Sequence, residues 1–224
     1  MGAILREYGY RGFMIFGVFV IVALTICRRK QYGLSVLVSV LYILTHFTIG
    51  VLGAVILFAA KNGFASFQGM AFYGGIFLIM MTMPFLAHLF QLTPGQALDI
   101  SAPALAAYSA VFRFGCLCAG CCGGIVCNIG NITFQWPTQI MEAVGDILLL
   151  AVLLYLSEKK EKEGLLYPLF LVHYGMIRFA IEWVRTMEPF FWGMTEGHWN
   201  SLLSILIGTV WLYCRRKKQT KTMH

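Results

Sequence analysis

Residues 34–60 read LSVLVSVLYILTHFTIGVLGAVILFAA, which is 27 consecutive positions without a charged side chain. A helix needs roughly 20 mostly apolar residues to cross the hydrocarbon core of a bilayer. This stretch exceeds that length and offers no charged face to water. It therefore predicts a membrane-spanning helix, and it sets how the rest of the chain is interpreted.

The composition of the whole chain agrees with a membrane protein. Among 224 residues, 59% are apolar and only 12% are charged, whereas a soluble domain carries about a quarter charged residues. This composition excludes an ordinary cytosolic globule, a disordered chain and a nucleic-acid-binding module. The net charge of +7 is concentrated, because eleven of the 17 basic residues form three clusters. These are Arg28-Arg29-Lys30, then Lys159, Lys160 and Lys162, and finally Arg215 to Lys218 with Lys221.

The apolar runs between these clusters predict an all-α, polytopic membrane protein with about seven transmembrane helices. We expect a single transmembrane domain over residues 1–224, because the chain is short and the runs follow one another closely. An odd number of spans puts the two termini on opposite sides of the membrane. The predicted spans are about 10–27, 34–60, 70–91, 97–114, 137–157, 165–186 and 197–214.

The distribution of basic residues predicts the orientation. Lys and Arg near span ends accumulate on the cytoplasmic side. With the N-terminus outside and the C-terminus in the cytoplasm, all three basic clusters face the cytoplasm. Four basic residues then lie on the outer side: Arg6, Arg11, Lys61 and Arg185. The Gly- and Cys-rich stretch 115–136 also lies outside.

Charged residues in the sixth span form a stripe. At 100° per residue, Tyr174, Arg178, Glu182 and Arg185 fall within about 80° of one another on a helix. A charge at bilayer depth is costly and usually faces a functional cavity. Two arginines and one glutamate leave this stripe net positive, which suits an anionic ligand. The alternative is that Glu182 only neutralises Arg178 or Arg185. Even then, one arginine of the stripe has no carboxylate partner on this helix.

The fifth span carries a matching polar stripe, since Gln139, Glu142 and Asp146 fall within about 60° of one another. Arg113 ends the fourth span, near the outer boundary. Alone, it is explained equally well by snorkelling of its side chain to the headgroups. Together with Arg178, it predicts a pair of guanidinium groups that hold a phosphodiester through bidentate hydrogen bonds.

The outer stretch also contains five of the seven cysteines: Cys116, Cys118, Cys121, Cys122 and Cys127. Three interpretations are open. Disulfides form on the outer face of a membrane. A thiolate metal site is the second interpretation, although the spacing differs from the two-plus-two pattern of a zinc ribbon. The third is a tight re-entrant loop of small residues that sets one thiol beside Arg113.

Several segments, taken in order, match the motifs of one known family. Tyr174-Gly175-x-x-Arg178-Phe179-x-x-Glu182-x-x-Arg185 fits the pattern Tyr-Gly-x-x-Arg-Phe-x-x-Glu-x-x-Arg closely. Weaker matches are Phe72-Tyr73-Gly74-Gly75, Asp99 to Pro103 followed by Arg113-Phe-Gly115, Pro137-Thr138-Gln139-Ile-Met-Glu142, and Gly197-His198-x-x-Ser201. Over about residues 10–215, the chain resembles the bacterial prolipoprotein diacylglyceryl transferases.

The resemblance implies a reaction and its participants. The family transfers the diacylglyceryl group of phosphatidylglycerol to a cysteine thiol of a lipobox peptide and releases glycerol phosphate. It implies a multi-pass protein of the bacterial cytoplasmic (inner) membrane. The expected partners are phosphatidylglycerol, a lipobox-type peptide or another thiol acceptor, and the lipid bilayer, without nucleic acid. From this resemblance we expect neither a metal nor an organic cofactor.

The resemblance also implies roles for individual residues. Arg113 and Arg178 would hold the phosphate, and Tyr174 would orient that site. Glu182 and Arg185 would lock Arg178, and Gln139 and Glu142 would line the cavity. The implied catalytic set is Arg113, Arg178, Tyr73 and Tyr174. The implied substrate-binding set is Gln139, Glu142, Glu182, Arg185, Gly74 and Gly75.

Departures from the family pattern leave the acceptor open. Tyr73 stands where the family has a histidine, and Cys116 and Cys121 replace polar residues of its outer loop. The outer segment 123–136 is short. We therefore keep three further hypotheses. One of the thiols Cys116, Cys118, Cys121 and Cys122 is a transient carrier; the chain is a thiol-redox or metal-handling membrane protein; or it is a catalytically silent lipid-binding relative.

Overall fold

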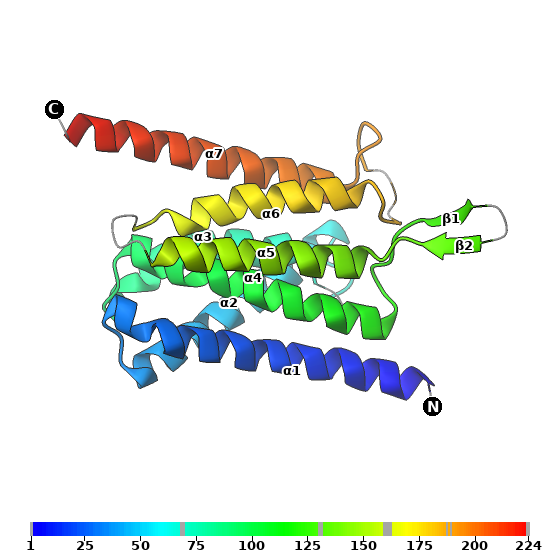
Figure 1. Ribbon diagram of the computed structural model, residues 1–224, viewed down its shortest axis with the longest axis horizontal. Helices are drawn as coiled ribbons and strands as arrows, with labels where there is room; N and C mark the ends of the chain where they lie inside the picture. Colours follow the sequence, from blue (N-terminus) through cyan, green and yellow to red (C-terminus); the bar gives the residue numbers. More distant parts are fainter. Residues whose placement is uncertain are drawn as a thin grey trace.

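The computed structural model describes residues 2–67, 70–129, 132–158, 163–186, 188 and 190–222. Within these ranges the chain forms long helices that run alternately back and forth, so that the two termini lie at opposite ends of one bundle (Figure 1). The helices are α1 (Gly2–Arg28), α2 (Val36–Lys61), α3 (Phe72–Leu86), α4 (Pro94–Ala119), α5 (Thr138–Ser157), α6 (Leu166–Glu182) and α7 (Glu196–Thr222). Short 3-10 helices follow α1 (Arg29–Tyr32) and α3 (Ala87–Phe90).

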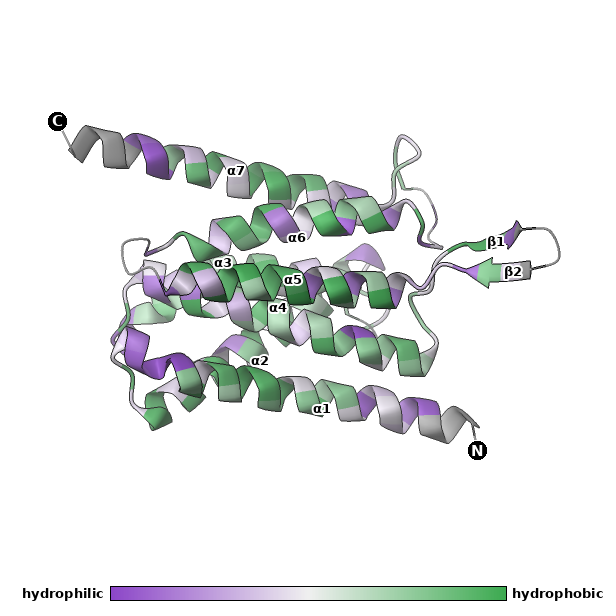
Figure 2. Ribbon diagram, in the orientation of Figure 1, coloured by the Kyte–Doolittle hydropathy of each residue, from purple (hydrophilic) through white to green (hydrophobic). Residues whose placement is uncertain are grey.

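Five of the described helices, α1 to α5, are long and apolar enough to cross a membrane. Seven such helices were expected from the sequence. The difference lies in α6, which has only 17 residues, and in α7, whose first turns are polar. Figure 2 shows hydrophobic residues along the middle of the bundle and hydrophilic residues toward its ends. The basic residues Lys159, Lys160 and Lys162 lie outside the described residues.

Helix α4 is the centre of the bundle. Its segment Ala102–Ala107 is entirely buried, because small side chains let neighbouring helices approach closely. Thr93 and Gln96 form a capping box at its start, and Gly120, with φ 70°, ends it. The helix continues past the predicted end at residue 114, since the buried Arg113 does not mark a boundary.

Asp99, near the start of α4, attaches α6 to this centre. Its carboxylate accepts hydrogen bonds from the backbone N–H groups of Gly164 (2.5 Å) and Leu166 (2.8 Å). These donors lie at the N-terminus of α6, where helix N–H groups lack partners within the helix. Asp99 is therefore a buried charge whose hydrogen bonds are made within the protein.

Glycines bring α2 and α3 into direct backbone contact. A Cβ on Gly74 would lie 2.1 Å from the carbonyl oxygen of Gly53, and one on Gly75 would lie 2.6 Å from that of Gly50. No larger residue fits at these positions without moving a helix. Gly74 and Gly75 were expected to bind substrate, and the structure places them in this helix–helix contact.

A β-hairpin extends from the end of the bundle at which α1 begins (Figure 1). It consists of β1 (Val126–Ile129) and β2 (Ile132–Gln135), paired antiparallel with Val126 opposite Gln135. The base of the hairpin joins the segment after α6, because Ile125 N–H donates to the carbonyl of Val184 (2.8 Å). The described chain is mostly helical, as expected of an all-α membrane protein, and the hairpin is a small addition to it.

Candidate active site

A cavity of about 430 Å³ opens at the hairpin end of the bundle. Its walls come from α1, α2, α3, α4, α6 and α7 and from the loops between them. Three arginines and two tyrosines that were predicted as site residues line it: Arg113, Arg178, Arg185, Tyr73 and Tyr174. Residues more than 100 positions apart in the sequence are thus brought to one chamber.

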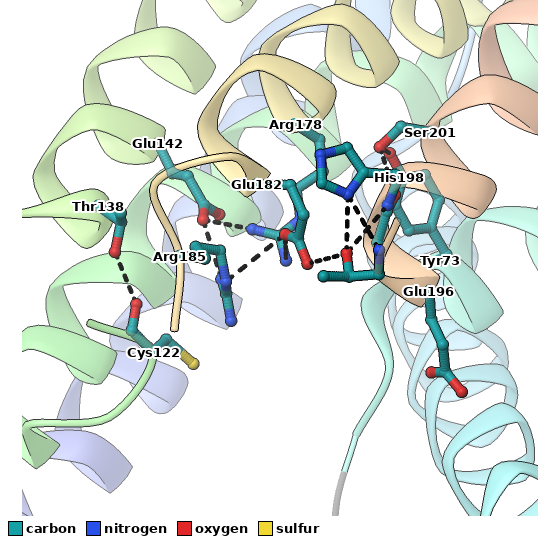
Figure 3. Close-up of polar contacts among 12 residues, drawn as sticks. Tyr73, Cys122, Thr138, Glu142, Arg178, Glu182, Arg185, Glu196, His198 and Ser201 are labelled. Atoms are coloured by element: carbon teal, nitrogen blue, oxygen red, sulfur yellow. Dashed lines mark hydrogen bonds and ion pairs between the residues drawn. The ribbon is translucent and has the colours of Figure 1, made fainter. Parts of the chain in front are cut away.

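All three arginines meet at one carboxylate, that of Glu142 on α5. Arg113 Nη2 lies 2.5 Å from Glu142 Oε2, and Arg185 Nη1 lies 3.0 Å from Oε1. Arg178 Nη1 also contacts Oε1, as Figure 3 shows. The sequence indicated only that Glu142 lines the cavity, whereas the structure makes it the common partner of arginines from α4, α6 and the loop after α6.

Glu182 is the second carboxylate of the cluster. Arg178 Nη2 lies 2.8 Å from its Oε2, and Arg185 Nε lies 3.5 Å from the same atom. Glu182 thus contacts both arginines of its stripe, and not just one of them. In direct ion pairs, three guanidinium groups face two carboxylates, and the cluster keeps a surplus positive charge.

The arginines retain hydrogen-bond donors after these contacts. A guanidinium has five N–H donors, and Arg113 Nε is buried without a hydrogen-bond partner among the described residues. Buried polar atoms are almost always hydrogen-bonded in folded proteins. Arg113 also lines the cavity, so a ligand oxygen there would lie beside a guanidinium group with an unused donor.

Arg185 reaches the cluster from a loop. Helix α6 ends at Glu182, and Arg185 lies beyond it in an isolated β-bridge with Gly124. The sequence had placed Arg185 on the helical face of the span 165–186. The bridge keeps the side chain directed at Glu142. Arg185 therefore lies beside Glu182, as predicted, although the helix ends before it.

The start of α5 holds the cysteine-containing loop. Gln139 Nε2 donates to the carbonyl of Cys121 (2.6 Å), and Thr138 Oγ1 donates to the carbonyl of Cys122 (2.7 Å). Gln139 was expected to line the cavity. It lies behind the wall, with 7% of its surface exposed, and its contact fixes the loop that forms the wall.

Tyr73 and Tyr174 form an aromatic part of the wall. Their rings pack edge to face with centroids 5.6 Å apart, and the hydroxyl of Tyr73 shares a hydrogen bond of 2.8 Å with Ser201 of α7. Ser201 in turn donates to the carbonyl of Gly197 (2.7 Å). The position of the family's histidine is thus occupied by a phenol hydrogen-bonded to a serine.

Glu182 is also held by Thr195, which no sequence motif predicted. Thr195 Oγ1 donates to Glu182 Oε1 (2.8 Å), and the backbone N–H of Thr195 donates to His198 Nδ1 (3.2 Å). The ring of His198 packs against Trp183, with centroids 4.6 Å apart. Only the Gly197-His198 match indicated this region, because Thr195 itself belongs to no motif.

Three thiols from one short segment face the same cavity. Cys116, Cys121 and Cys122 line it, and their Sγ atoms all lie within 4.8 Å of one another. All seven cysteines are free thiols, and Cys118 is exposed. A hydrogen bond from Cys116 and the charges of Arg185 and Arg113 outweigh burial and lower the pKa of Cys122 to about 5. Burial and the charge of Cys122 raise the pKa of Cys121.

A smaller pocket of about 70 Å³ adjoins the cavity between α1, α2, α3 and α4. Met70, Phe72 and Phe112 line both spaces. Apart from His46, the side chains that line the smaller pocket are apolar or are the hydroxyphenyl ring of Tyr108. A polar chamber with arginines therefore lies directly beside an apolar pocket.

Comparison with known proteins identifies the family. The sequence profile of the family described as prolipoprotein diacylglyceryl transferase matches residues 3–214. The phosphatidylglycerol–prolipoprotein diacylglyceryl transferase of Verminephrobacter eiseniae is 31% identical over 173 residues, which cover 70% of this chain and 62% of that protein. The protein of the same name from Hydrogenovibrio crunogenus is 30% identical over 165 residues, covering 65% of this chain and 62% of that protein.

The chain therefore spans just over three fifths of the length of these relatives, at 62% in both cases. The matched region includes the arginines from α4 and α6, Glu142 and the aromatic wall, since the profile runs through all of them. The match over 3–214 also agrees with the order of motifs along the chain. The chain belongs to the prolipoprotein diacylglyceryl transferase family.

Proposed function

We propose that the chain is a membrane-embedded transferase that moves the diacylglyceryl group of phosphatidylglycerol to a cysteine thiol. The observation that carries this proposal is the convergence of Arg113, Arg178 and Arg185 on Glu142 in the wall of a cavity. A phosphodiester carries one negative charge, which matches the surplus charge of the ion-paired cluster. The names of the relatives, which state a phosphatidylglycerol donor and a prolipoprotein acceptor, support the same substrates here.

The reaction is a displacement at carbon. The acceptor sulfur, as a thiolate, attacks the glycerol carbon that bears the phosphate and forms a thioether. The bond between that carbon and the phosphate oxygen breaks, and its electron pair leaves with glycerol phosphate. Negative charge therefore grows on the phosphate as the bond breaks, and the donors of Arg113 and Arg178 stabilise it.

The remaining side chains support this role. Glu182 and Arg185 hold Arg178 in place, and Tyr174, which lines the same cavity, orients the arginines. Tyr73 offers its hydroxyl to the cavity while hydrogen-bonded to Ser201. From behind the wall, Glu142 holds the arginines and Gln139 holds the cysteine-containing loop. Gly74 and Gly75 keep α3 close to α2. The adjoining apolar pocket receives part of the lipid's hydrocarbon.

We further propose that all seven helices cross the membrane as one domain over residues 1–224. The N-terminus is outside and the C-terminus is in the cytoplasm. Arg28 and Arg29 end α1 at the end of the bundle where α7 also ends, opposite the hairpin (Figure 1). This is the distribution of basic residues expected of a cytoplasmic face. The membrane is the bacterial cytoplasmic membrane, and the cavity then opens at the depth of the outer headgroups.

A product assay tests the proposed function. The purified protein is mixed with phosphatidylglycerol vesicles and a short lipobox-type peptide that contains one cysteine. Mass spectrometry should detect a thioether-linked diacylglyceryl peptide and free glycerol phosphate. A peptide with serine in place of cysteine should remain unmodified. Absence of the thioether product with active vesicles and intact protein would contradict the proposal.

A further inference from the structure

The thiols of Cys116, Cys121 and Cys122 are gathered by a turn of unusual backbone geometry. Cys116 lies in the last turn of α4, and Gly120 follows with φ 70°. Cys122 has φ 61°, although non-glycine residues rarely adopt this left-handed conformation. Two left-handed residues so close together fold the chain back over the end of α4. Such strained positions concentrate at functional sites.

Hydrogen bonds hold this turn in place. The N–H of Cys121 donates to the carbonyl of Cys116 (3.1 Å). Gln139 and Thr138 donate to the carbonyls of Cys121 and Cys122, as described above. The backbone of the two loop cysteines is therefore fixed from α4 on one side and from α5 on the other. Both side chains line the cavity, where Cys121 Sγ also donates to the carbonyl of Cys116 (3.7 Å).

The spacing of the three sulfurs is close to that of a zinc site. With a Zn–S distance of about 2.3 Å, tetrahedral ligands lie about 3.8 Å apart. The three Sγ atoms lie within 4.8 Å of one another. Side-chain rotations that shorten the distances between the sulfurs by up to about 1 Å would give the spacing of a zinc site. Three protein ligands and one open position are the arrangement of zinc sites that act on a substrate.

The proposed reaction, on which this inference rests, needs the acceptor thiol to be deprotonated. Among the described residues, no histidine lines the cavity. Glu142 and Glu182 are held by arginines, and Tyr73 is hydrogen-bonded to Ser201. Glu196, another carboxylate of the wall, pairs with Lys61. Outside the three thiols, the described wall therefore offers no free carboxylate or imidazole. A metal ion does this task without one, because a coordinated thiol is deprotonated outright.

We propose that Cys116, Cys121 and Cys122 bind a zinc-like divalent cation, and that its open fourth position takes the acceptor sulfur. Each thiol loses its proton to solvent on binding. Three thiolates and one divalent cation carry a net charge of −1, and Arg113 and Arg185 line the same cavity. The acceptor thiol likewise releases its proton to solvent as it binds the metal. Its sulfur leaves the metal as it attacks the glycerol carbon, and the oxygen–carbon bond breaks as described for the transferase.

Metal binding is measured first, without reference to activity. Reduced full-length protein in detergent is stripped with a chelator and titrated with Co²⁺, whose thiolate complexes have a charge-transfer absorption band. We expect one Co²⁺ per chain, displaced by Zn²⁺. Serine at Cys116, Cys121 or Cys122 should weaken binding by at least roughly tenfold, because even changes outside the ligand shell cost that much. Cys127→Ser, in the hairpin, is the matched control and should bind normally.

Two results would overturn the metal site. One is failure of the wild-type chain to bind Co²⁺ at one per chain. The other is an unchanged band in the variant with all three cysteines replaced by serine. The first result does not depend on the folding of any variant. A disulfide between two of the three thiols in the protein as isolated from membranes, found by mass spectrometry, would equally contradict a resident metal.

The fourth position is tested with the acceptor itself. Addition of the single-cysteine peptide to the Co²⁺ protein should intensify the charge-transfer band, and the serine peptide should leave it unchanged. If both peptides leave it unchanged, the metal does not take the acceptor. The two proposals fail separately: full transfer by the metal-stripped protein would refute the metal's role alone. Metal binding without any thioether product would refute the transferase alone.

Discussion

The two ends of α4 each bury a charge, and they differ in what is left over. Asp99 at one end accepts hydrogen bonds from two backbone N–H groups at the start of α6, and these bonds hold the two helices together. Arg113 at the other end contacts Glu142 but keeps a buried Nε donor without a partner in the described chain. A satisfied charge attaches one helix to another, whereas an under-satisfied charge on a cavity wall is suited to a ligand.

The largest effect should follow from removing the carboxylate shared by the arginines. Glu142→Gln leaves three buried guanidinium groups with one glutamate, and breaking a buried ion pair costs about 3–5 kcal/mol. We expect a lower unfolding temperature in detergent together with loss of transfer. If this variant were as stable as the wild-type protein, the cluster would not be the structural centre of the cavity end.

Arg178→Lys should separate binding geometry from charge. Lysine keeps the positive charge but loses the planar fork that holds a phosphate through two bonds. We expect transfer to fall by about 10²–10³-fold, the cost of removing one donor to developing charge, while the unfolding temperature changes little. A fully active Arg178→Lys protein would show that the fork is not needed.

Asp99→Asn tests the other side of the comparison. The amide still accepts one hydrogen bond, but it brings an NH₂ group toward a donor, and leaving a buried donor unsatisfied costs about 1–3 kcal/mol. Thermal unfolding should detect this loss. The transfer rate of the folded fraction should match the wild-type rate, and a drop in that rate would make Asp99 part of the site.

The smallest effect is expected from Tyr73→Phe. This change removes only the hydroxyl bonded to Ser201 and preserves the ring that packs on Tyr174. A net hydrogen bond is worth about 0.5–1.5 kcal/mol, so transfer should fall by roughly tenfold or less. A loss as large as that of Arg178→Lys would make the phenol a catalytic base and would remove the need for a metal-bound thiolate.

Much of the fold can be predicted from the sequence, because charge-free runs of sufficient length have few alternatives. The helix ends are less predictable. Arg113 looked like a boundary, yet α4 continues to Ala119 because Glu142 neutralises that arginine inside the bundle. The hairpin was missed because each of its strands has only four residues, which is too short for a pattern of alternation to stand out.

The site residues could be predicted as separate stripes but not as a cluster. Helical spacing places Arg178 and Glu182 on one face of α6, and it says nothing about which residue of α5 they meet. The role of Glu142 as a shared partner depends on contacts between α4, α5 and α6. Likewise, the three thiols are adjacent only because Gly120 and Cys122 adopt left-handed backbone conformations.

The most direct test is an experimental structure of the protein in a bilayer that contains phosphatidylglycerol. We predict that the lipid phosphate lies in the cavity with its oxygens about 2.7–2.9 Å from the guanidinium groups of both Arg113 and Arg178. A phosphate bound elsewhere, with both arginines still held only by Glu142 and Glu182, would contradict the proposal that Arg113 and Arg178 bind the lipid phosphate.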